Sequence, residues 1–378
     1  MSRIIHLLLR CAPARSAPAS YPGSWHAWRG AVLGVLVLVL GALPHNARAA
    51  DAAAPTVVRI GMASVGVGGT PCVGGTIIGY AQATGLLEHE FQADGIRIQW
   101  IFHKGAGPAV NEGIAAGGLD LAWQGDLPAL IGRSAGLPTR LLMAASRGGN
   151  AYLAVPVSSP AKSLHDLVGK RVVLFRGTAP QLAIDRILGA EGLSERDFQT
   201  ISLDTSSGLT ALTDGDVDAM WGSYLFFELR DRGLVRFVFS TQDPPPAPDR
   251  PWATSQSGLL VTEDFVTRYP AIVQRIINVL VRADVWAADP AHAQELYQTW
   301  SKSGTPAAHF QEDFQKVPPV RRLSPLLDSD FLGQLAASMQ QAQGFHLIRG
   351  PVALDAWCDR SFLDHALAQL PQPTPWAQ

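Results

Sequence analysis

The sequence is poor in cysteine and in net charge. Its 378 residues contain 3 cysteines, and 30 basic residues nearly balance 32 acidic ones, which gives a formal net charge of −2. So few cysteines cannot form the disulfide framework of a small secreted domain. A neutral balance without runs of basic residues excludes the broad positive surface that binds nucleic acid. We therefore expect no nucleic-acid partner.

Several motifs of catalytic and metal sites are also absent. The ten histidines are scattered, without a His-x-x-His or His-Glu-x-x-His pair, so no metal site is indicated. No Gly-x-Ser-x-Gly turn is present, which argues against a serine hydrolase. No Gly-Lys-Ser/Thr follows the glycine-rich stretch at 65–77, which argues against a phosphate-binding P-loop. We expect neither a cofactor nor a metal.

Long apolar runs are confined to the N-terminus. Four arginines precede the uncharged run AVLGVLVLVLGAL at 31–43, and Ala47-Arg48-Ala49 follows it. This run is shorter than the roughly 20 residues that span a bilayer, and the order of basic, apolar and small residues is typical of a signal peptide. We expect residues 1–49 to be cleaved on export to the periplasm. An uncleaved anchor helix is the alternative.

The rest of the chain alternates short strands with helices. Branched apolar runs predict strands at 57–63, 96–102, 119–124, 139–145 and 152–157. Helical segments are expected between them, at 76–90 (interrupted by Gly85), 107–118 and 125–136. A second series of the same kind runs from a short helix at 163–168 to a strand at 234–240. This order predicts an α/β fold with mostly parallel sheets.

Two lobes are expected, because the chain crosses between two α/β units near 150 and again near 250. One lobe would comprise 50–150 and 253–378, and the other 151–252. Two connections between lobes form a natural hinge. The carboxyl ends of strands and the N-termini of helices would then meet in the cleft.

Three loops share one pattern, in which a strand ends, small residues follow and a helix begins. They lie at 64–76, 124–130 and 176–182. Helix N-termini carry free N–H groups and a partial positive charge, so three of them around one cleft would bind an anion. Plain strand–helix turns have the same pattern and are the alternative. The candidate ligand-binding residues are Ser64, Gly69, Thr70, Cys72, Gln124, Gly125, Asp126, Arg147, Arg176, Gly177, Thr178, Ala179, Trp221 and Tyr224.

The candidates differ in what they would contribute. Arg147 and Arg176 could add charge-assisted hydrogen bonds to an anion, although Arg147 could equally be a solvated charge at the hinge. Asp126 could cap its helix instead of touching ligand. Tyr224 is the aromatic residue that we expect to stack on an organic tail.

Three segments resemble the sulfonate, nitrate and taurine substrate-binding proteins of ABC transporters. They are AGPAVNEGIAAGGLDLAWQGDLPALIGRSAG (106–136), SLHDLVGKRVVLFRGTAPQLAIDRIL (163–188) and LTDGDVDAMWGSYLFFEL (212–229). The resemblance implies a two-lobed, type II periplasmic-binding-protein fold with an anion pocket in the cleft. It implies a monomer that captures a small organic anion, most often a sulfonate, and delivers it to an inner-membrane ABC permease.

The same resemblance assigns two of the loops to the pocket. Gly125–Pro128 and Arg176–Ala179 would line it in both lobes. Trp221-Gly222-Ser223-Tyr224 stands where the family often has a Trp-x-Pro turn. This departure leaves the organic tail open, and a binder of nitrate or of a pyrimidine precursor is a further alternative.

A second resemblance is to hydroxybiphenyl sulfinate desulfinase, an enzyme with a nucleophilic cysteine in its first strand–helix loop. Cys72 lies thirteen residues before Gly85-Leu86-Leu87, as that cysteine does, and 258–289 and 351–367 are similar as well. This implies an alternative function as a Cys-dependent C–S lyase.

The residues around Cys72 argue for binding instead of catalysis. The histidine and arginine of the desulfinase would fall near Val110 and Ala122, where neither residue type is present. A thiol without a nearby base or cation stays mostly protonated. We expect Cys72 at the start of its helix, where the thiol pKa is lowered modestly, as a packing or binding-wall residue. A disulfide with Cys358 is a further alternative.

Overall fold

The computed structural model describes residues 54–245 and 252–376. The expected signal peptide at 1–49 and Cys11 lie outside the described residues. Within the described ranges, every helix is too short or too polar to cross a membrane.

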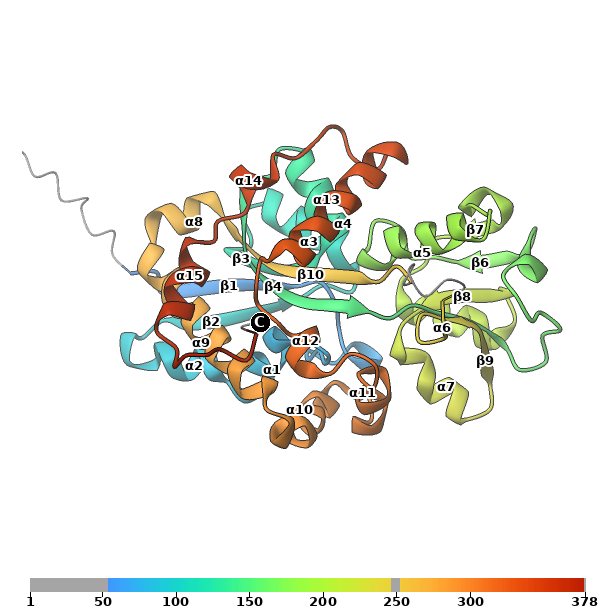
Figure 1. Ribbon diagram of the computed structural model, residues 1–378, viewed down its shortest axis with the longest axis horizontal. Helices are drawn as coiled ribbons and strands as arrows, with labels where there is room; N and C mark the ends of the chain where they lie inside the picture. The colour runs from blue at the N-terminus through green and yellow to red at the C-terminus, as the bar shows by residue number, and fades with distance from the viewer. Residues whose placement is uncertain (1–53, 246–251, 377–378) are drawn as a thin grey trace, which may run out of the picture. The chain divides into compact units, whose positions relative to one another are not determined.

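Two five-stranded sheets organise the chain, one in each of two lobes (Figure 1). The first has the order β2-β1-β3-β10-β4 and the second β7-β6-β8-β5-β9. The strands are β1 (Val57–Met62), β2 (Arg97–Phe102), β3 (Leu121–Gly125), β4 (Thr139–Gly149), β5 (Tyr152–Pro156), β6 (Arg171–Val173), β7 (Gln199–Ile201), β8 (Ala219–Gly222), β9 (Val235–Ser240) and β10 (Ser255–Thr262). The predicted two-lobed α/β fold is confirmed.

Both sheets are mixed, so the expectation of mostly parallel sheets was wrong. In the first sheet β1 pairs in parallel with β2 and β3, but β10 lies antiparallel between β3 and β4. In the second, β5 lies antiparallel between β8 and β9. The antiparallel strands are those next to the crossings between lobes, where the chain re-enters a sheet from the other lobe.

The helices flank these sheets. They are α1 (Ile77–Thr84), α2 (Leu86–Phe91), α3 (Ala106–Ala115), α4 (Asp126–Ser134), α5 (Ala179–Ala190), α6 (Thr205–Asp214), α7 (Phe227–Asp231), α8 (Glu263–Arg268), α9 (Pro270–Ala288), α10 (Ala293–Trp300), α11 (Ala307–Asp313), α12 (Pro319–Arg322), α13 (Ser329–Gly344), α14 (Leu354–Trp357) and α15 (Ser361–Ala368).

Local sequence explains several helix ends. The Thr76 hydroxyl accepts hydrogen bonds from the N–H groups of Ile78 and Gly79 and so caps α1. Gly85 ends α1 with a φ of 71°, a conformation that favours glycine. The expectation of a helix at 163–168 was wrong, because only a 3-10 turn forms there, at His165–Leu167. There the Asp166 carboxylate accepts from the N–H groups of Lys162 and Ser163 and competes with helix formation.

Each lobe has its own hydrophobic core. The core of the first lobe joins residues of β1 to residues of the last helices, with Trp300 and Trp357 fully buried in it. The second sheet buries one cluster on each face, around Leu153 and around Tyr152. The C-terminal helices therefore complete the lobe that the N-terminal strands begin, and the cleft lies between two separately packed bodies.

Candidate functional site

Two adjoining chambers lie between the lobes. The narrow chamber has a volume of about 250 Å³ and the wide chamber one of about 730 Å³. Four residues line both of them, namely Ser64, Ala106, Phe175 and Thr205. The two chambers therefore adjoin, separated only by residues that border both.

The narrow chamber has no charged side chain among the described residues that line it. Its polar groups are mostly hydroxyls, contributed by Ser64, Ser146, Thr178, Thr205, Ser223, Ser255 and Ser257. The hydroxyl of Ser257 accepts from the indole N–H of Trp123 at 2.9 Å and lies 2.6 Å from the Ser146 hydroxyl. The hydroxyls of Thr205 and Ser223 have no hydrogen-bond partner within the described part of the chain. They remain available to a ligand.

Two helix N-termini open on the narrow chamber, one from each lobe. Ala106 and Gly107 begin α3, and Thr178, Ala179 and Pro180 begin α5. Neither helix has a side-chain cap, whereas Thr76, Asp204, Thr262 and Asp328 cap α1, α6, α8 and α13. The first N–H groups of an uncapped helix lack intrahelical partners and attract negative charge. Here the N–H of Ala106 already donates to the carbonyl oxygen of His103 at 3.0 Å, and Pro180 has no N–H. Within the described residues, the N–H groups of Gly107 and Ala179 have no such partner. The chamber therefore suits a small oxyanion without a protein countercharge.

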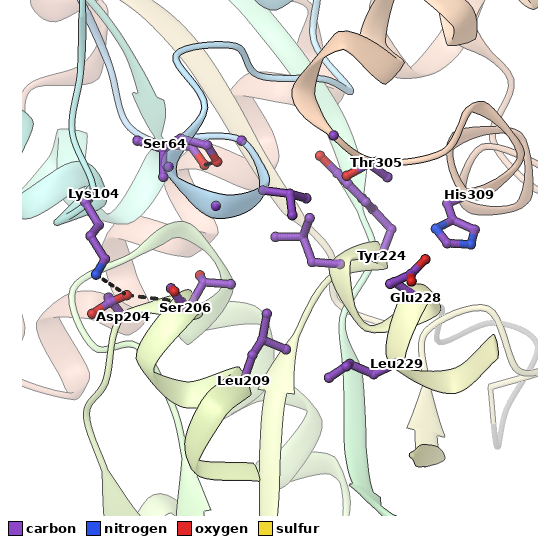
Figure 2. A pocket seen from close by; sticks show the side chains of 18 of the residues that line it. Ser64, Lys104, Asp204, Ser206, Leu209, Tyr224, Glu228, Leu229, Thr305 and His309 are labelled. Atoms are coloured by element: carbon purple, nitrogen blue, oxygen red, sulfur yellow. Dashed lines mark hydrogen bonds and ion pairs between the residues drawn. The ribbon is translucent and has the colours of Figure 1, made fainter. Parts of the chain in front are cut away.

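The wide chamber is lined by apolar side chains and by a similar number of polar or charged ones (Figure 2). Leu209 of α6 and Leu229 of α7 face the loop that contains Val65 and Val67. Charged groups lie around it, including Lys104, whose Nζ is 3.6 Å from a carboxylate oxygen of Asp204. That ion pair joins the two lobes.

Half of the predicted ligand-binding residues line a chamber. Ser64 lines both, Gly69 and Tyr224 line the wide chamber, and Gly125, Thr178, Ala179 and Trp221 line the narrow one. The three loops singled out in the sequence therefore do meet at the cleft. The other seven candidates, Thr70, Cys72, Gln124, Asp126, Arg147, Arg176 and Gly177, lie outside both linings.

Both candidate arginines are ion-paired elsewhere. Arg147 donates to the carboxylate of Asp328 at 2.8 and 2.9 Å. Arg176 is exposed and lies 2.7 Å from the carboxylate of Glu195. Neither guanidinium group faces the cleft, so the charge expected from these residues is missing from the narrow chamber.

Asp126 and Gln124 are buried behind the narrow chamber. The Asp126 carboxylate accepts from the N–H of Leu127 and from the hydroxyl of Ser338, each at 2.8 Å. Burial raises the pKa of Asp126 to about 6. Gln124 donates to the side chain of Asn111. Both residues therefore support the wall of the site and do not line it.

Cys72 is a buried residue of the glycine-rich loop. It precedes Thr76, the cap of α1, by four positions, so the expectation that it starts the helix was wrong. Burial raises the pKa of its thiol, and the charge of Lys302 offsets this only in part, which reverses the predicted direction. Cys72 and Cys358 are both free, so the disulfide alternative is not realised in the structure.

The sequence analysis missed several lining residues. Phe175 and Thr205 line both chambers, and Ser255, Gln256 and Ser257 of β10 line the narrow one. The Asp-Thr-Ser-Ser run that caps α6 was a usable signal for Thr205. The three β10 residues had no recognisable signal in the sequence. They reach the chamber only because β10 inserts between β3 and β4.

The lobes also meet along a buried contact, here called the α13 seam, which consists of Asp126, Leu127, Leu182, Arg186, Ser338, Gln341 and Ala342. Leu127, Leu182 and Ala342 form an apolar cluster from α4, α5 and α13. Arg186 of α5 donates to the hydroxyl of Ser338, which in turn donates to Asp126. Burial lowers the pKa of Arg186, since the guanidinium group is removed from water.

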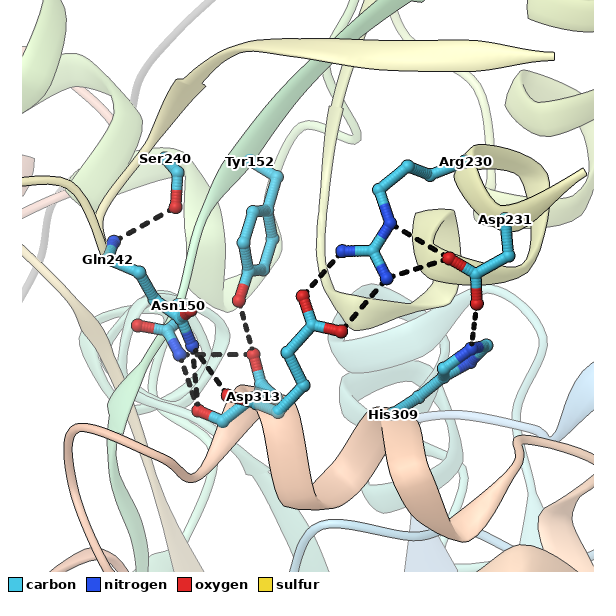
Figure 3. Close-up of polar contacts among 9 residues, drawn as sticks. Asn150, Tyr152, Arg230, Asp231, Ser240, Gln242, His309 and Asp313 are labelled. Atoms are coloured by element: carbon cyan, nitrogen blue, oxygen red, sulfur yellow. Dashed lines mark hydrogen bonds and ion pairs between the residues drawn. The ribbon is translucent and has the colours of Figure 1, made fainter. Parts of the chain in front are cut away.

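A second contact, the α11 seam, consists of two polar pairs between α7 and α11 (Figure 3). Arg230 forms a two-pronged ion pair with Glu312, and the imidazole Nε2 of His309 lies 2.8 Å from the carboxylate of Asp231. The bonds with His309 and Arg230 lower the pKa of Asp231. His309 is buried, but Arg230, Asp231 and Glu312 are more exposed to solvent than the carboxylate and hydroxyl of the α13 seam.

A third group, the hinge anchor, ties both crossings to the end of α11 (Figure 3). The Asp313 carboxylate accepts from the hydroxyl of Tyr152 at 2.7 Å and from Asn150 at 3.0 Å. Gln242, on the second crossing, donates to the backbone carbonyl of Asp313. Arg322 forms a buried ion pair with Asp313 at 2.7 Å. One buried carboxylate thus fixes the geometry from which the lobes would move.

The chain is similar to a known protein family and to a solved structure. The profile of the NMT1/THI5-like family matches residues 80–293, more than half of the chain. The solved structure described as "putative sulfonate ABC transporter, periplasmic sulfonate-binding protein SsuA" from Methylobacillus flagellatus KT is similar, with 29% identity and a TM-score of 0.66. The similarity covers 82% of this chain and 94% of that one.

Two curated relatives are similar over shorter lengths. A Bacillus subtilis protein named "Putative aliphatic sulfonates-binding protein" is 26% identical over 57% of this chain and 64% of its own length. The 2'-hydroxybiphenyl-2-sulfinate desulfinase of Rhodococcus erythropolis is 34% identical over 43% of each chain. The chain thus spans less than two thirds of the curated relatives that it matches, and one of these binds whereas the other is an enzyme.

Proposed function

Because the chain belongs to the NMT1/THI5-like family, we propose that it is the solute-binding component of an ABC importer and captures an organic sulfonate between its lobes. The observation that carries this proposal is the narrow chamber, where two uncapped helix N-termini from opposite lobes meet hydroxyl groups. A sulfonate oxygen accepts hydrogen bonds from such donors, and contact with both lobes would favour their closure.

The residues that would hold the head group follow from the lining. The backbone at Gly107 and at Thr178–Ala179 would supply N–H donors, with the hydroxyls of Thr205 and Ser223 beside them. Trp123 and Trp221 would enclose the first carbons of the tail. In this proposal Arg147, Arg176 and Asp126 shape the cleft without touching ligand.

The same proposal includes the bounds of the two lobes, the export of the protein and its permease partner. We place one lobe at 50–150 and 253–378 and the other at 151–252, in keeping with the strands of the two sheets. Residues 1–49 would direct export and be cleaved, and the monomer would deliver its ligand to an inner-membrane permease. N-terminal sequencing of the protein from the periplasmic fraction tests the cleavage, and retention of residues 1–49 would contradict it.

The binding experiment is a thermal unfolding series on the chain without residues 1–49. Alkanesulfonates, taurine, aryl sulfonates, nitrate and a pyrimidine would each be present at about a hundred times the expected dissociation constant. Binding then adds about 2.7 kcal/mol to the free energy of unfolding, and the melting temperature rises by several degrees. We expect a rise with at least one sulfonate and none with nitrate. A rise with nitrate or the pyrimidine alone would overturn the sulfonate proposal.

The desulfinase alternative is tested with the same protein. The similarity to that enzyme and the position of Cys72 in the first strand–helix loop favour it, while the burial and raised pKa of the Cys72 thiol oppose it. We expect no sulfite release from biphenyl-2-sulfinate, and we expect Cys72→Ala to change sulfonate affinity by less than about twofold. Sulfite release that is lost in Cys72→Ala would replace the binding proposal with a catalytic one.

A further inference from the structure

The wide chamber is larger than a sulfonate head requires. Its volume is about 730 Å³, and a cavity of about 150 Å³ holds a benzene ring. The narrow chamber, at about 250 Å³, has room for a head group and a few carbons. The ligand site as a whole therefore has space for a tail of two or more rings.

The two chambers adjoin closely enough for one molecule to reach from one into the other. Ser64, Ala106, Phe175 and Thr205 border both spaces. Of these, Phe175 presents an aromatic side chain at the junction. A ligand whose head lies at the helix N-termini would therefore project its tail past Phe175 and into the wide chamber.

Apolar side chains from both lobes form part of the walls of the wide chamber. Leu209 and Leu229 come from the second lobe, and Val65, Val67 and Pro306 from the first. Val67 is 51% exposed, although it lies between two lobes. Exposed apolar area of this kind is stabilised when a ligand covers it.

Tyr224 provides a fixed aromatic surface. Its ring packs on Phe310, with 5.0 Å between centroids, and its hydroxyl lies 3.4 Å from the carbonyl oxygen of Gly74. Both contacts are with the opposite lobe. A side chain held in this way loses little entropy when a ring of the ligand packs beside it.

The charges around the wide chamber do not favour a second ionic group. Lys104 and Asp204 neutralise each other across the lobes. Glu228 and Arg232 lie four residues apart on one side and are of opposite sign. A tail with its own charge would therefore find no matching excess of either sign.

We propose that the ligand is a sulfonate with a bulky, uncharged, ring-containing tail, whose head lies in the narrow chamber and whose tail fills the wide one. This inference rests on the proposed function, because it takes the head group from it. Leu209, Leu229 and Tyr224 are then the residues that select the tail.

Calorimetric titration of three sulfonates tests the tail directly. Ethanesulfonate, benzenesulfonate and naphthalene-2-sulfonate share the head and differ in tail size. We expect naphthalene-2-sulfonate to bind roughly 100-fold more tightly than ethanesulfonate, since buried apolar area contributes about 25 cal/mol per Å². Affinities within about threefold of one another would overturn the tail assignment and leave the proposed function standing. If no sulfonate binds, the proposed function fails, and this inference fails with it.

Two variants that fill the wide chamber provide an independent test. Leu209→Trp and Leu229→Trp should each weaken naphthalene-2-sulfonate at least about tenfold and change ethanesulfonate less than about threefold. Thr210→Trp is the matched control, because Thr210 is exposed on the same helix as Leu209 and does not line the chamber. Equal losses for the short and the bulky sulfonate in both leucine variants, but not in the control, would overturn the proposal.

Discussion

The two seams that join the lobes differ in how they are built. At the α13 seam, apolar side chains surround a buried carboxylate and a half-buried guanidinium group. At the α11 seam, ion pairs such as Arg230–Glu312 remain partly open to water. Exposed ion pairs contribute little, whereas buried polar groups are costly to disturb. The contrast teaches that the α13 seam and the hinge anchor determine stability, and that the α11 seam can open at small cost.

The largest effect is expected at the hinge anchor. Asp313→Ala removes the partner of the buried Arg322 guanidinium and the acceptor of Tyr152 and Asn150. We expect the free energy of unfolding to fall by about 3–5 kcal/mol, measured by urea denaturation. Glu312→Ala, one residue away in the α11 seam, is the control and should cost less than about 1 kcal/mol. If both variants lost the same free energy of unfolding, the hinge anchor and the α11 seam would not differ in stability as proposed.

The α13 seam should respond to pH through Asp126. The folded pKa of about 6 lies above the unfolded value of about 3.9, so the folded state keeps a proton that the unfolded state has lost. This carboxyl therefore favours folding below pH 4, and its contribution is lost as the pH rises through 6. Asp126→Asn stays neutral, so its stability relative to the unmodified chain should improve by about 2 kcal/mol between pH 4 and 7.

Denaturation curves of both proteins at pH 4, 5.5 and 7 check this prediction. Other titrating groups are common to the two chains and cancel in the difference. A difference that stays constant over this range would show that Asp126 titrates normally and that the α13 seam is less buried than described.

A smaller effect is expected where a glycine lets the lobes approach. A Cβ atom added at Gly125 would lie 2.1 Å from that of Ala179 in the other lobe, although the backbone of Gly125 is extended and accepts any residue. Gly125→Ala should therefore hold the lobes apart and weaken sulfonate binding about tenfold, with little loss of stability. Titration calorimetry and urea denaturation measure the two effects. Unchanged affinity would mean that closure does not bring these residues together.

The smallest effect is expected at the α11 seam. Arg230→Gln removes the ion pairs with Glu312 and Asp231, and we expect a loss of less than about 1 kcal/mol that shrinks further in 1 M salt. Denaturation at low and high salt measures it. If the free energy of unfolding fell by several kcal/mol and did not depend on salt, the α11 seam would be as important to stability as the hinge anchor.

The fold was largely predictable because its signals are local. Strand ends followed by small residues located the three cleft loops, and Gly125, Thr178 and Ala179 line the narrow chamber as expected. The antiparallel strands were missed, since no local pattern shows that a returning strand will enter between two earlier ones. Sheet order depends on pairings between segments that are far apart in the chain.

The charges of the site could not be predicted in the same way. Arg147 looked available, but its partner Asp328 lies 181 residues further on. The partner of Arg176 is Glu195, which is only 19 residues away. The whole of α5 lies between these two residues in the sequence. The protonation of Cys72 likewise depends on burial by segments that the loop itself does not contain. Residue type and spacing located the cleft, while long-range packing decided which groups face it.

The two tryptophans of the narrow chamber give each lobe its own optical reporter. Trp123 lies on β3 and Trp221 on β8, on opposite sides of the space that the head group would fill. Indole emission responds to local polarity, so ligand entry will alter the intrinsic fluorescence of both. The chain has ten tryptophans, so each of the two is isolated by difference, as the part of the signal that is lost when it alone is replaced by phenylalanine. Their surroundings differ, because Trp221 packs on Phe239 whereas Trp123 donates a hydrogen bond to Ser257. Rapid mixing of the two variants with ligand then reveals which lobe is touched first.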